Sequence, residues 1–137
     1  MNEAFRVLKK DGIVYAATPF MQQVHGGAYD FTRFTHLGHS RLFKRFKVIE
    51  SGICAGAGVS LAWSLKYIFR SLCDNKIIQK GTEIIISFLF FWLKYINYLI
   101  VNNKSVYDSA SVYYFIGKKS EDILSDKELV KLYRGNI

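Results

Sequence analysis

The stretch that decides the fold is EAFRVLKKDGIVYAATP, from Glu3 to Pro19. It begins with a helical pattern, in which apolar residues recur at offsets of three and four: Ala4, Val7 and Leu8. Gly12 is a typical helix stop. The apolar residues 13–17 that follow predict a short buried strand, which Pro19 ends. The chain therefore begins with a helix followed by a strand, which is part of an α/β pattern.

The rest of the chain predicts further helices and strands in alternation. Residues 47–53 alternate as a strand does, and residues 110–117 are rich in the β-branched and aromatic residues of a buried strand. A short helix after Thr35 and long helices over 59–72 and 82–101 are expected from apolar periodicity, with a polar break from Asp74 to Gly81. Ser125 and Glu128 form a capping-box pattern before a short C-terminal helix. The predicted fold class is α/β.

Composition excludes several classes of protein. Half of the 137 residues are hydrophobic, so global disorder is excluded. The formal charge of +8 favours acidic partners, but the Lys and Arg residues are scattered, and we expect no nucleic-acid binding. Cys54 and Cys73 form no metal-binding or redox spacing and are expected to be free thiols. The N-terminus has no long apolar run, so no signal peptide is expected. The predicted location is cytoplasmic, with association with a membrane surface as an alternative.

Residues 3–19 resemble the segment that leads into the fifth strand of class I S-adenosylmethionine-dependent methyltransferases of the methyltransferase type 11 kind. The loop from Tyr29 to Thr35, YDFTRFT, resembles the Asp-aromatic-x-Arg-aromatic-Thr signature found after that strand in many small-molecule methyltransferases. The resemblance implies that residues 1–137 are one partial domain, the C-terminal part of a Rossmann-like methyltransferase fold. Its last three strands would be 13–18, 47–53 and 110–117, the last two forming an antiparallel hairpin, with a helical insertion over about 57–104.

The family binds its methyl donor with a Gly-rich turn after the first strand and an acidic residue that ends the second. Neither is identified here, because Gly56-Ala57-Gly58 is too short and follows the wrong strand. The resemblance therefore implies S-adenosyl-L-methionine as the cofactor of the parent domain, and no cofactor and no activity for this chain alone. The expected partner is the N-terminal half of the domain or another copy of the chain.

Candidate site residues cluster in the loop after the first strand. In open α/β sheets ligands lie beyond the carboxyl ends of strands, so this loop is expected to border a substrate. His25 and Tyr29 are the candidate catalytic residues, as general bases on a hydroxyl or amine acceptor. Asp30, Arg33 and His36 are candidate substrate-loop residues. We interpret Asp30 and Arg33 as an ion pair that clamps the loop rather than as a catalytic dyad.

His36 and His39 are three residues apart, and His25 is close in sequence. Three imidazoles can bind a metal ion when the geometry is tight and a carboxylate supports them. Histidines in one polar region commonly arise without a metal. No metal site is predicted.

Residues 82–101 allow three interpretations. Twenty helical residues span about 30 Å, enough to cross a bilayer, but Lys94 at mid-membrane would cost about 3 kcal/mol. A buried helix that covers the sheet is favoured, followed by an amphipathic helix on a membrane surface or in a lid, and then by a true span. An aromatic insertion suggests a lipid-like acceptor. The alternative function is a non-catalytic, membrane-associated or protein-binding module that uses this helix.

Overall fold

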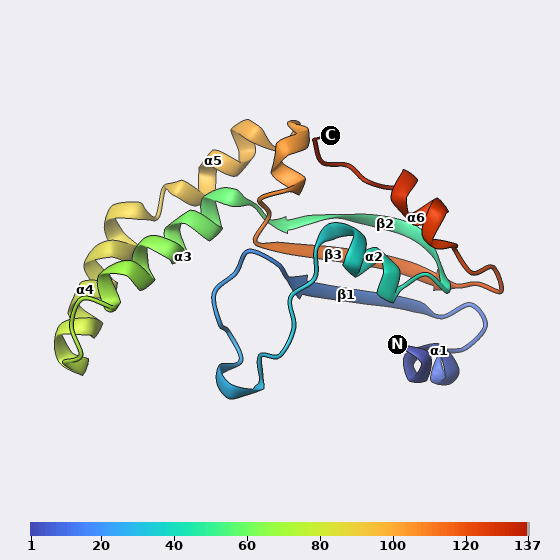
Figure 1. Ribbon diagram of the computed structural model, residues 1–137, viewed down its shortest axis with the longest axis horizontal. Helices are drawn as coiled ribbons and strands as arrows, with labels where there is room; N and C mark the ends of the chain where they lie inside the picture. The colour runs from blue at the N-terminus through green and yellow to red at the C-terminus, as the bar shows by residue number, and fades with distance from the viewer. Residues whose placement is uncertain (137) are drawn as a thin grey trace.

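The structure is a computed structural model that describes residues 1–136 (Figure 1). A three-stranded sheet carries short helices at one end and a long helical projection at the other. In chain order the elements are α1 (Asn2–Val7), β1 (Ile13–Pro19), η1 (Gly27–Tyr29), α2 (His36–Leu42), β2 (Phe46–Ala55), α3 (Ala57–Arg70), α4 (Lys76–Phe90), α5 (Leu93–Ile100), η2 (Lys104–Tyr107), β3 (Val112–Lys119) and α6 (Asp126–Lys131).

The sheet has the order β1-β3-β2, and β3 pairs antiparallel with both neighbours. Tyr15 lies opposite Ile116 in one pair, and Gly52 lies opposite Tyr114 in the other. The register shifts between Val48 and Glu50, so the longer β2 bends around β3. The prediction of a mixed α/β fold with three strands is confirmed, and β1 is an edge strand of this sheet.

The core lies on the face of the sheet that α1 and α2 cover. Phe43 and Phe115 stack with ring centroids 4.5 Å apart, and Phe46 completes the buried cluster. Phe5 and Leu8, from the N-terminal helix and the residue that caps it, pack against this cluster. On the opposite face, Ile13 and Tyr15 are exposed. The sheet therefore buries one face much better than the other.

The segment between β2 and β3 forms a helical hairpin that projects from the sheet (Figure 1). The predicted polar break over 74–81 is wrong in its extent. The Asn75 side chain accepts hydrogen bonds from the backbone N–H groups of Ile77 and Ile78, so α4 begins at Lys76 and Gly81 lies inside it. The single helix expected over 82–101 is instead two helices, because Phe91 and Trp92 form a turn between the end of α4 and the start of α5.

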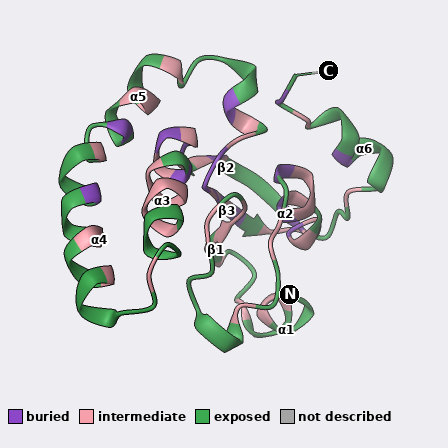
Figure 2. Cartoon of the chain, turned by 60° about the vertical axis from the view of Figure 1, so that its left-hand side comes forward, coloured by how far each residue is buried: buried purple, intermediate pink, exposed green. Residues whose placement is uncertain are grey.

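The expectation that residues 82–101 cover the sheet is also wrong, because α4 and α5 pack against α3. Gly58 permits this approach, since a Cβ there would collide with the carbonyl oxygen of Leu93. Figure 2 shows how little of α4 and α5 is buried. Within the described residues, one helical stretch, Lys76–Ile100, has the length and the apolar composition needed to cross a membrane; it contains 25 residues.

Candidate functional site

The loop after β1 is closed by an ion pair. The two terminal nitrogens of the Arg33 guanidinium, Nη1 and Nη2, each donate to one carboxylate oxygen of Asp30. This confirms the predicted pair. A planar guanidinium matches a carboxylate in such a two-pronged contact, which fixes orientation as well as charge.

The same pair ties the two sides of the loop together. Arg33 Nε donates to the carbonyl oxygen of Gln22 and Nη2 donates to that of Gln23, both at 3.1 Å. The Asp30 carboxylate accepts the backbone N–H of His25 at 2.8 Å. The Arg33 guanidinium, followed by this backbone donor, holds the pKa of Asp30 well below its usual range. The clamp therefore fixes residues 22–33 as one unit.

The clamped loop docks on α3. Gln23 Nε2 donates to Ser64 Oγ at 2.7 Å, and the Tyr67 hydroxyl donates to the carbonyl oxygen of Val24 at 3.3 Å. The His25 ring lies edge-on to Trp63, with centroids 6.5 Å apart. Local sequence patterns could not predict these contacts, because they join segments about 40 residues apart. They bring His25 to the helical hairpin.

The two candidate catalytic residues occupy different surroundings. His25 lies beside Trp63, whereas Tyr29 ends the 3-10 turn η1 at the loop tip and is 85% exposed. Phe31, next to the clamp, is also exposed. The catalytic roles of His25 and Tyr29 stay predictions.

His36 lies away from the loop, in an aromatic cavity of about 270 Å³. Its ring packs against Tyr107 and Tyr113, with centroids 5.3 and 5.5 Å away. The side chain is buried, and neither ring nitrogen has a hydrogen-bond partner in the described structure. Burial lowers the pKa of His36, and the positive charge of Arg134 lowers it further. A neutral imidazole therefore offers one donor and one acceptor to the cavity.

Polar groups from the second half of the chain complete this cavity. The Tyr133 hydroxyl and the backbone N–H of Asn136 both donate to the Asp108 carboxylate, which holds the pKa of Asp108 below its usual value. The Tyr113 hydroxyl donates to the carbonyl oxygen of Tyr107. Phe20, which directly follows β1, also lines the cavity. Sequence reasoning missed Tyr107, Asp108 and Tyr133, since no local pattern connects them with His36.

His39 belongs to the core. It is buried, its ring meets those of Phe43 and Phe115 edge-on, and burial lowers its pKa to about 4. The three histidines thus occupy three surroundings: His25 at α3, His36 in the cavity and His39 in the core. Across residues 1–136 no three His, Cys, Asp or Glu side chains are grouped so as to hold a metal ion.

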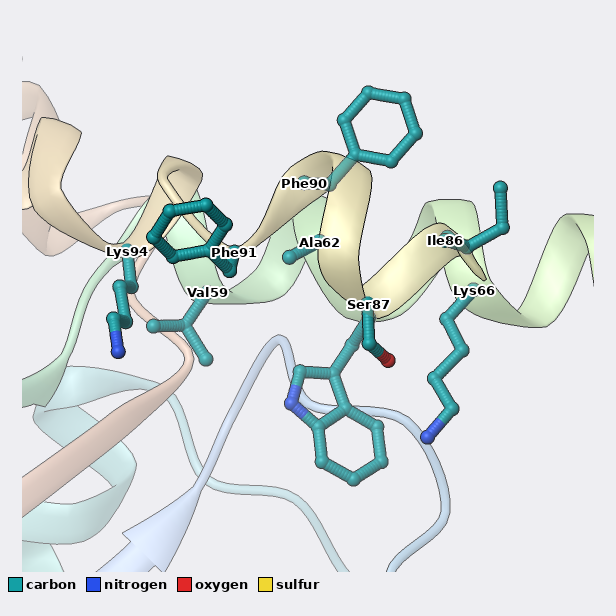
Figure 3. Close-up of a pocket in the computed structure, with 9 residues that line it drawn as sticks. Val59, Ala62, Lys66, Ile86, Ser87, Phe90, Phe91 and Lys94 are labelled. Atoms are coloured by element: carbon teal, nitrogen blue, oxygen red, sulfur yellow. The ribbon is translucent and has the colours of Figure 1, made fainter. Parts of the chain in front are cut away.

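A second, apolar groove of about 280 Å³ lies between α3 and α4–α5 (Figure 3). Lys66 and Lys94 extend toward the same side of this groove, and Ser87 lies between them (Figure 3). The Lys66 ammonium lies 5.4 Å from the ring centre of Trp63. The lining residues are Val59, Ala62, Trp63, Lys66, Ile86, Ser87, Phe90, Phe91 and Lys94. Through Trp63 this groove adjoins His25 and the clamped loop.

The glycines at the start of α3 do not form a nucleotide cradle. A Cβ at Gly56 would meet the side chain of Asn97, and a Cβ at Gly58 would meet the backbone of Leu93. Their lack of a side chain thus serves the packing of α3 on α5. The pair therefore does not fit the role of a cofactor-binding turn.

Comparisons with protein-family models, with curated proteins and with solved structures find no match for this chain.

Proposed function

We propose that this chain forms the substrate-side, C-terminal part of a class I S-adenosylmethionine-dependent methyltransferase domain. The observation that carries the proposal is the antiparallel pairing of β2 with β3 beside β1, with the Asp30–Arg33 loop leaving the carboxyl end of β1. The family resemblance implies a closing hairpin of this kind and a loop of this kind after the fifth strand. The methyl acceptor is a small or lipid-like molecule.

The open side of the sheet supports a further segment of the domain. As an edge strand of this sheet, β1 has one side on which another strand can pair. The exposed Ile13 and Tyr15 give an apolar surface that a covering helix would bury. The partner proposed here is therefore the N-terminal half of the domain, in a longer form of this protein.

In this proposal the residues described here position the acceptor and receive its proton. The Asp30–Arg33 clamp holds the loop at the carboxyl end of β1. His36 joins His25 and Tyr29 as a candidate base, because burial lowers the pKa of its imidazole and neither ring nitrogen has a hydrogen-bond partner in the described structure. S-adenosyl-L-methionine supplies the methyl group when bound by the partner half. The location expected for such an enzyme, with free thiols at Cys54 and Cys73, is cytoplasmic.

The test is to read the in-frame DNA upstream of Met1 for a strand, a Gly-rich turn and a helix. The longer protein is then assayed for transfer of a labelled methyl group from S-adenosyl-L-methionine to lipid extracts and small phenols. We expect transfer that Arg33→Ala weakens and that Arg41→Ala, which breaks an exposed ion pair with Asp126, leaves unchanged. An upstream sequence without a Gly-rich turn, or a longer protein that binds no S-adenosyl-L-methionine, would overturn the proposal.

A further inference from the structure

The outward side of α4 and α5 is apolar along its whole length. The residues turned toward α3 recur every three or four positions and include Glu83, Ile86, Leu93 and Asn97. Opposite them, Ile77, Phe88 and Leu99 are 84%, 77% and 83% exposed. We call this exposed surface the outer stripe; its residues are Ile77, Ile84, Ile85, Phe88, Trp92, Tyr95 and Leu99.

Two polar residues of these helices, Glu83 and Asn97, make their contacts inside the hairpin. Glu83 accepts a hydrogen bond from Arg70 at 2.7 Å and lies 3.7 Å from the Lys66 ammonium. Asn97 Oδ1 accepts the backbone N–H of Gly58 at 3.0 Å. A helix on the surface of a soluble protein normally turns its polar side outward. Here Glu83 and Asn97 face α3, and the side of the two helices that faces outward is apolar.

The charges beside the outer stripe indicate what covers it. Within residues 76–100 the only acidic residue is Glu83, which is paired inside the hairpin. The exposed charged residues of this segment are basic: Lys76, Lys80 and Lys94. A second copy docked on the stripe would bring like charges together. An anionic lipid surface complements both the apolar stripe and its basic borders.

A position in the interface fits this segment better than a membrane span. A span would place Lys94 and the Glu83 ion pairs in the hydrocarbon, where charged groups are costly. The 25 residues cover about 38 Å, and Trp92, Tyr95 and Tyr98 are exposed near the turn between the helices. Such amphipathic rings favour the headgroup level of a bilayer. The hairpin projects beyond the end of the sheet at which β2 leads into α3 (Figure 1).

We propose that the outer stripe of α4 and α5 docks on an anionic membrane surface, with both helices lying in the plane of the interface. The inference does not depend on methyl transfer. It gives the chain a membrane partner.

Vesicle flotation of the full chain tests the proposal. We expect binding to vesicles of equal parts phosphatidylcholine and phosphatidylglycerol, and weak binding to pure phosphatidylcholine. The double variant Ile84→Ser/Phe88→Ser should lower the partition coefficient by about tenfold or more, because two apolar side chains lose their lipid contacts. The matched control is Ile123→Ser/Val130→Ser, which changes two exposed apolar residues outside the hairpin and should bind unchanged. Circular dichroism checks that the helices persist in each variant.

Tryptophan fluorescence adds a second readout. Trp63→Phe leaves Trp92 as the sole tryptophan, and its emission should shift to the blue on anionic vesicles. Equal loss of flotation in both double variants, or a Trp92 emission unmoved by anionic vesicles, would overturn the proposal. A concentration-dependent dimer without vesicle binding would assign the stripe to a second copy instead. Resistance of the bound chain to alkaline extraction would assign it to a span.

Discussion

Arg33 and Asp30 are three residues apart, yet their contact joins both sides of the loop that follows β1. The guanidinium donates to both carboxylate oxygens of Asp30 and also donates hydrogen bonds to the carbonyl oxygens of Gln22 and Gln23. Asp30 in turn accepts the N–H of His25. The positions of these residues thus depend on one ion pair, and the loop is held by polar contacts rather than by an apolar core.

Loss of the clamp should loosen the loop without unfolding the sheet. We expect Arg33→Ala to raise the hydrogen-exchange rate of the His25 amide, whose acceptor Asp30 loses its partner. Arg33→Lys should rescue little, because an ammonium cannot make the same two-pronged contact. Amide exchange by NMR is the measurement. The control is Arg6→Ala, which breaks the exposed Glu3–Arg6 pair. Unchanged exchange at His25 in Arg33→Ala would show that the clamp does not order the loop.

The aromatic core should carry much of the stability. Phe115 is buried and stacks on Phe43, so we expect Phe115→Ala to cost about 3 to 5 kcal/mol in the free energy of unfolding. The matched control, Phe31→Ala, removes an exposed ring and should cost less than about 0.5 kcal/mol. Urea unfolding followed by circular dichroism measures both. Similar losses for the two variants would contradict the assignment of the core.

The sequence predicted the elements whose signals are local. Thr35 was expected to cap a helix, and its hydroxyl accepts the Gly38 N–H. The capping box of Ser125 and Glu128 is present. The short-range Asp30–Arg33 pair was also predictable. In each case a few neighbouring residues decide the structure.

The sequence could not predict what depends on distant contacts. The apolar run over 82–101 suggested a helix buried on the sheet, but Gly58 allows α5 to pack on α3 instead, and the sheet is left uncovered on one face. The aromatic cavity of His36 needs Tyr107 and Tyr133, which lie 71 and 97 positions later in the chain. No local sequence pattern predicts contacts between residues so far apart in the chain.

The buried histidines predict a stability that falls in mild acid. Burial lowers the pKa of His39 to about 4 and also lowers that of His36, whereas an unfolded histidine titrates near 6.5. Below about pH 6.5 these histidines therefore bind protons in the unfolded chain but stay neutral in the folded chain. Stability should fall as the pH drops from about 6.5 toward 4, by at most about 1.4 kcal/mol per pH unit for each histidine.

Urea midpoints measured between pH 7 and pH 4 test this expectation. His39→Gln should flatten the profile in that window, because it removes one of the two groups. A wild-type profile that is flat from pH 7 to pH 4 would show that both imidazoles become charged as easily in the folded chain as in the unfolded one.

Replacing either of two glycines of the hairpin by alanine should change the free energy of unfolding, but in opposite directions. Gly58 lies where a Cβ would strike the carbonyl oxygen of Leu93, so Gly58→Ala should push α5 away from α3 and lower the free energy of unfolding by about 1 to 3 kcal/mol. Gly81 lies inside α4, where an added methyl group would point into open space, so Gly81→Ala should stabilise the helix by about 1 kcal/mol. Urea unfolding gives the two signs, and amide exchange in α5 reports whether Gly58→Ala acts through the helix contact. Equal, small effects at both positions would show that α5 does not rest on Gly58, and the close packing of the hairpin would then be wrong.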